Sequence, residues 1–244
     1  MDSNFLWLAS FVLIAYTTQA MTGFGSVIIA VTLGSHFYPL EILLPILVPL
    51  DVLLNSYIVT RYRKTVDKTI LFRKIVPLMG LGLLVGIFIF QFVQGPLLKN
   101  LFGLLVTLLC LRELYRLYRS TELKRTLSRL KYTLSILSAG IVQGVFASGG
   151  PLIVYAVSKF HLPKANFRST LASLWLLTNT TLTASYILTG RLTLESLRFI
   201  GLLIPLIGVG MVLGEKLHFH IDEHRFRILV YLILVVAGIS ILVG

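Results

Sequence analysis

Two short polar interruptions in apolar runs carry the residues of this chain that are best suited to bind a charged ligand. The first, "TQAMTGFGSV" at residues 18–27, lies within a run that is otherwise apolar from Phe5 to about Phe37. A break in a helix leaves backbone N–H and C=O groups without partners, so in hydrocarbon it persists only where protein or water supplies them. We therefore expect a binding site here, with substrate contacts from Gln19, Thr22, Gly23, Gly25 and Ser26.

The second interruption, "FASGGP", lies within the apolar run 132–160. An apolar segment follows each break: "SVIIAVTLG" after Gly25 and "PLIVYAVSK" after Gly150. If each segment is a short helix, its N-terminal N–H groups and positive dipole end would point at the break and attract an anion. Pro151 fits the first turn of such a helix, where its missing N–H costs nothing. The sequence thus predicts an anion site between the breaks, with Gln143, Ser148, Gly149 and Gly150 on its second side.

One acid is placed well inside an apolar segment. Asp51 lies in "PILVPLDVLLNS", and a buried acid in a membrane span is costly and therefore a candidate functional group. We interpret Asp51 as a proton-coupling residue, with a hydrogen-bonded structural acid as the alternative. Asn55 and Asn179 are candidate substrate contacts, and interhelical hydrogen bonds are the alternative for them.

The composition is that of a polytopic membrane protein. Hydrophobic residues make up 56% of the 244 residues and charged residues 13%, against about 25% charged residues in soluble domains. The net charge of +12 arises from basic clusters between apolar runs, which favours cytoplasmic loops facing anionic lipid over nucleic-acid binding. The single cysteine, Cys110, excludes an intrachain disulfide. The N-terminus has no Lys or Arg before the first apolar run, so we do not expect a secretory signal peptide.

The chain contains an internal repeat. A shift of 124 residues superimposes Gln19 on Gln143, Gly25 on Gly149, Pro39 on Pro163 and Asn55 on Asn179. After a four-residue offset, the pattern P-L-x-G-x-G-x3-G recurs at Pro77 and at Pro205. Internal repeats are the usual build of secondary transporters. We expect a first repeat at 1–118, a basic cytoplasmic connection at 119–131 and a second repeat at 132–244, all within one transmembrane domain.

Each repeat would position its interruption by the same order of elements. An interrupted run (about 5–36 and 132–160) precedes three ordinary spans, at about 41–60, 75–94 and 97–115 in the first repeat and near 168–188, 196–214 and 226–243 in the second. The predicted fold class is therefore all-α, each repeat being a glycine-broken helical hairpin followed by three transmembrane helices.

Basic residues indicate how the interrupted runs cross the membrane, because Lys and Arg concentrate on the cytoplasmic side. If each run crosses once, the repeats are parallel and 15 basic residues lie inside against 7 outside. If each run returns, the repeats are inverted, 19 lie inside and only Lys99, Arg191 and Arg198 lie outside. We favour inverted repeats with both termini outside. Whether each run is re-entrant or forms a pair of short spans stays open.

The duplicated unit, its motifs "TGFGSVIIAV" and "FASGGPLIVYAVSKFHLPK", and the glycine pattern of the third span resemble the sulfite exporter TauE/SafE family over almost the whole chain. The two halves differ within this resemblance, since Val27 stands where the second half has Pro151. The resemblance implies export of sulfite, of sulfonates such as sulfoacetate, or of related organosulfur anions.

These observations favour a secondary transporter that exports a small anion across a bacterial inner membrane. The chain has no P-loop motif, so we expect no use of ATP. Two alternatives remain: an anion channel, and an intramembrane hydrolase with Ser148 as nucleophile. We expect no catalytic residue, cofactor or metal, and the partners are the substrate anion and the lipid bilayer, with a homodimer left open.

Overall fold

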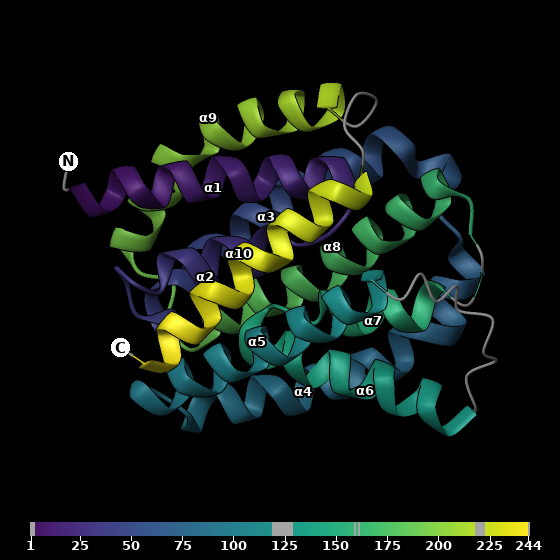
Figure 1. Ribbon diagram of the computed structural model, residues 1–244, viewed down its shortest axis with the longest axis horizontal. Helices are drawn as coiled ribbons and strands as arrows, with labels where there is room; N and C mark the ends of the chain where they lie inside the picture. The colour runs from purple at the N-terminus through teal and green to yellow at the C-terminus, as the bar shows by residue number, and fades with distance from the viewer. Residues whose placement is uncertain (1–2, 119–128, 159, 161, 218–222, 244) are drawn as a thin grey trace.

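The computed structural model describes residues 3–118, 129–158, 160, 162–217 and 223–243, and within these ranges its regular structure is entirely helical (Figure 1). The helices are α1 Ser3–Thr22, α2 Ser26–Gly34, α3 Leu40–Tyr62, α4 Val76–Phe92, α5 Pro96–Tyr118, α6 Arg129–Phe146, α7 Gly150–Ser158, α8 Lys164–Leu188, α9 Leu194–Leu217 and α10 Glu223–Val243. A 3-10 turn at Arg63–Thr65 and a π-helical turn at Ile70–Ile75 join α3 to α4. The predicted all-α fold is confirmed. Most of the predicted connection at 119–131 lies outside the described residues.

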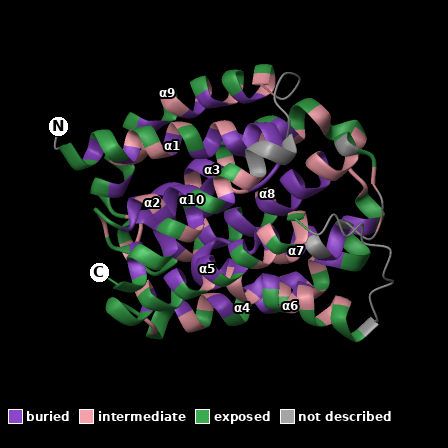
Figure 2. Cartoon of the chain, in the orientation of Figure 1, coloured by how far each residue is buried: buried purple, intermediate pink, exposed green. Residues whose placement is uncertain are grey.

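The outer surface of the helical bundle is apolar. Four described segments are long and apolar enough to cross a membrane, namely Ser3–Thr22, Leu40–Thr65, Ile70–Phe92 and Leu194–Leu217. On α4 the large side chains of Leu81, Leu84, Phe88 and Phe92 are each more than half exposed. Figure 2 shows exposed residues on the outer helices and buried residues at the centre. A surface of this kind suits contact with lipid, so the chain is a multi-pass membrane protein.

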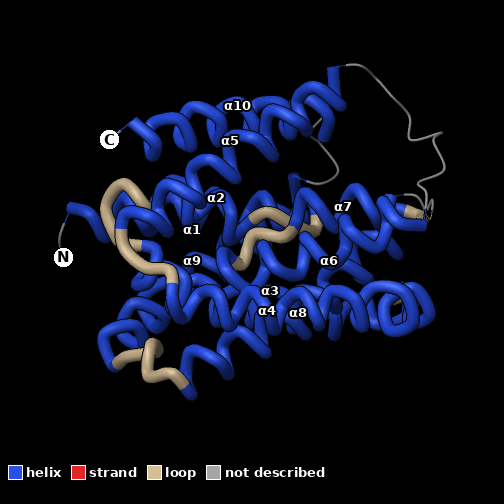
Figure 3. Tube along the Cα trace, turned by 90° about the horizontal axis from the view of Figure 1, so that it is seen from below, coloured by secondary structure: helices blue, strands red, loops and turns tan. Residues whose placement is uncertain are grey.

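Both interrupted runs turn back on themselves. Phe37, just after α2, stacks against Trp7 near the start of α1, with 6.5 Å between the ring centroids. Phe160, just after α7, packs against Tyr132 near the start of α6 at 6.0 Å. The end of each short helix therefore lies beside the beginning of the run, and Figure 3 shows loop segments at the reversals.

The two halves of the chain interleave. The most extensive helix contacts each join one helix from either half: α1 with α9, α4 with α6, α3 with α8 and α5 with α10. The main apolar core likewise contains residues of both halves. Neither half thus has a separate core, and a residue in one half can contact the other half near the centre of the bundle.

Small residues set the closest of these contacts. Gly82 and Gly86 of α4 face Gly140 and Gly144 of α6, and a Cβ atom at Gly82 would collide with the carbonyl oxygen of Leu137. Glycines allow two helix backbones to approach in this way, as is common in membrane proteins. The repeated glycine pattern of α4 thus has a packing role.

Charged residues divide between the two ends of the bundle. The connections at 35–39, 93–95 and 189–193 lie at one end, together with the start of α1 and the last turn of α10 (Figure 1). The basic residues near this end are Lys99, Arg191 and Arg198, whereas the connection between α3 and α4 at the opposite end is densely basic. Returning runs would group the connections in this way. Which end faces the cytoplasm stays a prediction.

Candidate functional site

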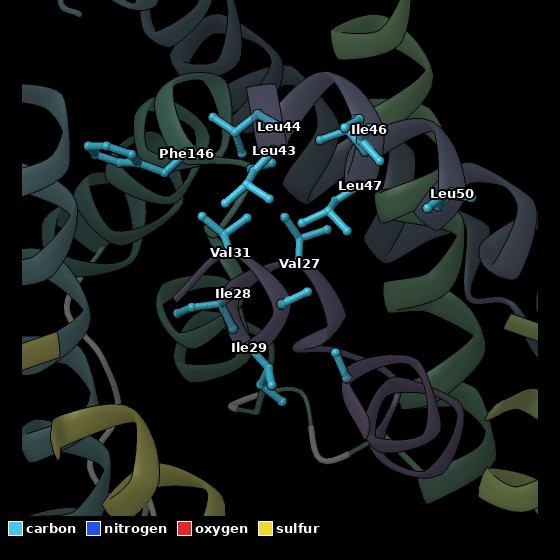
Figure 4. Packing of buried hydrophobic residues seen from close by; sticks show 14 of the residues in the cluster. Val27, Ile28, Ile29, Val31, Leu43, Leu44, Ile46, Leu47, Leu50 and Phe146 are labelled. Carbon is cyan, nitrogen blue, oxygen red and sulfur yellow. The ribbon is translucent and has the colours of Figure 1, made fainter. Parts of the chain in front are cut away.

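The centre of α3 lies beside the start of α2. Figure 4 shows Val27 and Val31 of α2 facing Leu43 and Leu47 of α3, and all four side chains are buried in the main core. This packing holds the first turn of α2 against the middle of α3. The next polar residue along α3 is Asp51, whose side chain is only 2% exposed.

The Asp51 carboxylate accepts four hydrogen bonds. Its Oδ1 accepts from Gln19 Nε2 at 2.7 Å and from Ser26 Oγ at 2.6 Å. Its Oδ2 accepts from Asn55 Nδ2 and from Asn179 Nδ2, both at 2.6 Å. Each carboxylate oxygen thus has two donors, which offsets much of the cost of burying the charge. The donors come from α1, α2, α3 and α8, so one acid joins four helices from both halves.

A glutamine closes each helix break. Gln19 Oε1 accepts a hydrogen bond from the backbone N–H of Ser26 at 2.9 Å, and Gln143 Oε1 accepts from that of Gly149 at 3.0 Å. In both cases the glutamine lies on the helix before the break and binds an N–H group at the start of the next helix. The side chain therefore satisfies a backbone donor that the break would leave without a partner.

Each glutamine also reaches the asparagine of the following long helix. Gln19 Nε2 lies 3.3 Å from Asn55 Oδ1, and Gln143 Nε2 lies 2.7 Å from Asn179 Oδ1. The repeat of Gln and Asn in the sequence is thus a repeated hydrogen-bonded pair. Because Asn179 also donates to Asp51, the two pairs join into one network at the centre of the protein.

A small cavity lies between the two breaks. It encloses about 20 Å³, enough for roughly one water molecule. Its walls are formed by Gln19, Gly25, Val27, Ile28, Asp51, Gln143, Ala147, Ser148, Gly150, Trp175 and Asn179. The first turn of α2 contributes to this lining, and its N–H groups lack the acceptors that a preceding helical turn would provide. The cavity therefore combines backbone and side-chain donors with one carboxylate.

The predicted site residues divide into three groups. Six of the predicted substrate contacts line the cavity together with Asp51: Gln19, Gly25, Gln143, Ser148, Gly150 and Asn179. Ser26, Asn55 and Gly149 lie behind this lining and hydrogen-bond to its residues. Thr22 and Gly23 face elsewhere: the hydroxyl of Thr22 donates to the carbonyl groups of Thr18 and Phe24 and lines a separate apolar pocket.

The tip glycines serve different purposes. Gly25, the residue before α2, has a φ of 105°, a backbone conformation that favours glycine, and it lines the cavity. Gly149 is packed against its own preceding helix, and a Cβ atom there would collide with the carbonyl oxygen of Ala139. Both glycines are among the predicted substrate contacts. For Gly149, packing accounts for the residue.

Four cavity residues were not among the predicted contacts: Val27 and Ile28 in the first turn of α2, Ala147 and Trp175. Trp175 occupies the place on α8 that the repeat pairs with Asp51, and its indole Nε1 donates to the carbonyl oxygen of Gly23 at 3.2 Å. Ala147 adopts a φ of 50°, which is uncommon for a residue other than glycine. The repeat alignment gave a signal for Trp175, because a large aromatic residue at the place of the buried Asp51 marks where the two halves differ. Nothing in the sequence marked Ala147.

In the described part of the chain, the surroundings of Ser148 are not those of a catalytic nucleophile. Its hydroxyl donates to the backbone carbonyl of Phe146 at 2.9 Å. A serine nucleophile instead needs a base that accepts its proton. The described His36 lies at the end of the bundle and pairs with Ser240 at 3.2 Å. The geometry of Ser148 therefore gives no support to the hydrolase alternative.

An apolar helical bundle with a buried polar cavity between two broken helices is the architecture of a membrane transport protein. Residues 8–241 match the family model described as "Sulfite exporter TauE/SafE", and the chain belongs to this family. The resemblance noted in the sequence is thus confirmed. The family consists of membrane transporters of sulfite or related anions rather than of enzymes. Comparisons with curated proteins and with solved structures return no match.

Proposed function

We propose that this protein is a secondary transporter that exports a small anion, namely sulfite, a sulfonate such as sulfoacetate, or a related organosulfur anion. The anion binds in the cavity between the two helix breaks. The observation that carries this proposal is the meeting of both breaks at one buried polar cavity, where Asn179 of one half donates to Asp51 of the other at 2.6 Å. Membership of the TauE/SafE family supports the sulfur chemistry of the substrate.

The donors available to an anion are the same ones that now bind Asp51. Gln19 and Asn179 line the cavity and donate to the carboxylate, which lies beside the first turn of α2. In this structure Asp51 itself fills the role of the anion at that helix N-terminus. A transported anion would therefore compete with the carboxylate for its hydrogen bonds.

Electrostatics decides how the two negative groups share the site. Two like charges 4 Å apart repel by about 4 kcal/mol at an effective dielectric constant of about 20. Protonation of Asp51 removes this repulsion and frees donors for the substrate. Anion and proton therefore bind cooperatively and move in the same direction across the membrane, so that export draws its energy from the outward gradient of the anion itself. In its proton-coupling role, Asp51 therefore favours anion binding when it is protonated and opposes it when it is ionised.

Transport also requires a conformational change. The cavity has room for roughly one water molecule, so we expect the breaks to separate when the larger sulfite anion enters. We propose that the halves are inverted repeats whose broken hairpins enter the membrane from opposite sides, with both termini outside the cytoplasm of a bacterial cell. Cysteine labelling at residues 2 and 244 tests this orientation, and a cytoplasmic location of either end would contradict it.

Counterflow in proteoliposomes tests the transport activity. Vesicles containing the purified protein are loaded with unlabelled sulfite and diluted into a trace of labelled sulfite. We expect transient accumulation of label inside, because a carrier exchanges its substrate across the membrane. Protein-free vesicles are the control, and sulfoacetate and sulfate as competitors define the substrate class. A flux without counterflow would indicate a channel, and no flux of any of these anions would contradict the proposal.

A further inference from the structure

We propose that Arg168 forms a second anion-binding site, which receives the substrate oxyanion before it reaches the central cavity. This inference rests on the proposed function and adds to it a residue and a route. Arg168 lies in the second turn of α8, at the basic end of the bundle. It is a separate place from the Asp51 network, which involves α8 only at Asn179.

The guanidinium group of Arg168 has an unused hydrogen-bonding edge. Its Nε and Nη2 atoms are buried, and nothing in the described part of the chain accepts a hydrogen bond from either. In arginine these two N–H groups point the same way and together can bind two oxygen atoms of one carboxylate, sulfonate or phosphate group. Burying two charged donors without an acceptor is costly, so this edge fits an oxyanion that the protein takes from solution.

The neighbouring side chains hold the guanidinium in place without neutralising it. Its Cζ lies 5.3 Å from the ring centroid of Tyr62, a cation–π distance. The acid close by on α9, Glu215, accepts instead from the hydroxyl of Tyr62, at 3.4 Å. Ser169, the next residue, pairs with Thr65 at 3.0 Å. The positive charge is therefore fixed in orientation, and in the described part of the chain no carboxylate forms an ion pair with it.

The position of Arg168 connects it with the cavity. A Cβ atom at Gly23, in the first break, would lie 3.1 Å from Arg168 Cγ, so the arginine packs directly against the break. Trp175 follows seven residues later on α8, donates to the carbonyl of the same Gly23 and lines the cavity. Spacings of seven and eleven residues place Arg168, Trp175 and Asn179 on one face of the helix. This face runs from the basic end to the Asp51 network, with about 10 Å of helix rise between Arg168 and Trp175.

The matched control is Arg191, near the opposite end of α8. Its Cζ lies 4.3 Å from the ring centroid of Phe90, and its Nη2 donates to the carbonyl of Phe90 at 3.2 Å. Arg191 thus resembles Arg168 in stacking on an aromatic ring, but its Nη2 has an acceptor within the protein. Removing each guanidinium in turn separates the effect of losing an edge without acceptors from the general effect of losing an arginine.

The test measures sulfite binding and sulfite exchange for Arg168→Gln, Arg168→Lys and Arg191→Gln. Binding is the rise in melting temperature of the detergent-purified protein with added sulfite, and exchange is counterflow in phosphatidylcholine vesicles. For Arg168→Gln we expect the sulfite concentration at half-effect to rise on the order of tenfold in both assays. Arg168→Lys, which keeps the charge but not the two-pronged edge, should lie between Gln and wild type. Arg191→Gln should leave both values unchanged.

Three results would overturn the inference. The first is a sulfite affinity in Arg168→Gln equal to that of the wild type. The second is an equal loss of sulfite affinity in Arg168→Gln and Arg191→Gln. The third is that Arg168→Gln loses only its stabilisation by added phosphatidylglycerol, which would assign the edge to a lipid headgroup. Melting temperatures without sulfite show whether the variants are folded. If Arg168→Gln does not fold, Arg168→Lys still tests the inference. If the wild type binds sulfite through Arg168 but gives no counterflow, the proposed function fails while this site stands.

Discussion

The two helix breaks are built alike but differ in one buried side chain. Both contain a glutamine that binds an N–H group at the start of the short helix and pairs with an asparagine of the next long helix. At the place where the first half has Asp51, the second half has Trp175. The glutamine–asparagine pair is thus a shared scaffold, and the charge belongs to one half alone. A single ionisable group serves the whole site, because Asn179 extends the second pair to it.

The breaks also differ in how tightly the backbone is packed. Gly25 has open space around its Cα, since a Cβ atom there would meet only the end of the Ile29 side chain, at 3.8 Å. Gly149, in contrast, abuts the carbonyl of Ala139. The first break is therefore restricted by its backbone conformation and the second by contact with its own helix.

Substitution of the two glycines should show this difference most strongly. Gly149→Ala places a methyl group against the carbonyl of Ala139 and next to Gln143, and we expect a loss of about 3 kcal/mol in stability. Gly25→Ala meets no such contact and costs about 1–2 kcal/mol, because alanine disfavours its positive φ. Melting temperatures in detergent measure both changes, and that of Gly149→Ala should fall by on the order of 10 °C. Equal shifts in the two variants would show that the breaks are packed alike.

Removal of the charge from the first half should uncouple transport from protons. Asp51→Asn is neutral at every pH, so we expect exchange of labelled sulfite to persist while uphill accumulation driven by a pH gradient falls at least tenfold. The measurement compares uptake into proteoliposomes with and without acid on the side of the labelled anion. The same acid should stimulate the wild type, because proton and anion move together.

One variant, Asn55→Ala, controls for the altered hydrogen bonding. An asparagine amide cannot accept from all four donors of the carboxylate, so Asp51→Asn is also expected to be less stable, by about 1–3 kcal/mol for each donor left unsatisfied. Asn55→Ala removes one of these donors and keeps the acid. If Asn55→Ala loses gradient-driven accumulation to the same extent, or if Asp51→Asn retains it, Asp51 is a structural acid.

The smallest expected effect concerns the aromatic residue that replaces the acid in the second half. Trp175→Phe keeps most of the packing but removes the 3.2 Å hydrogen bond to Gly23, which should cost about 1 kcal/mol. The melting temperature should fall by about 2–4 °C. Trp7→Phe is the control, since Trp7 is 54% exposed at the end of the bundle and should shift the temperature little. No difference between the two would mean that this contact does not hold the first break in place.

Much of the helical architecture was predictable from local sequence. Six predicted spans correspond to α3, α4, α5, α8, α9 and α10, and α2 begins at Ser26, directly after the glycine that the sequence placed at the break. Apolar length and glycine or proline punctuation act over short distances along the chain, so a pattern can indicate them. The grouping of Gln19, Asn55, Gln143 and Asn179 was foreshadowed by the repeat, because equivalent positions in two copies meet equivalent neighbours.

The sequence by itself determined that this chain is a helical membrane protein, where its helices are interrupted, and which polar residues recur. Only the tertiary structure decided what those residues bind. It placed Asp51 among four donors and turned Thr22 and Gly23 away from the cavity. It also assigned Gly149 to packing and set Arg168 against Gly23. The physical reason is that hydropathy and helix breaks depend on neighbours along the chain, whereas hydrogen-bond partners and close contacts depend on how α1, α3 and α8 pack across the two halves.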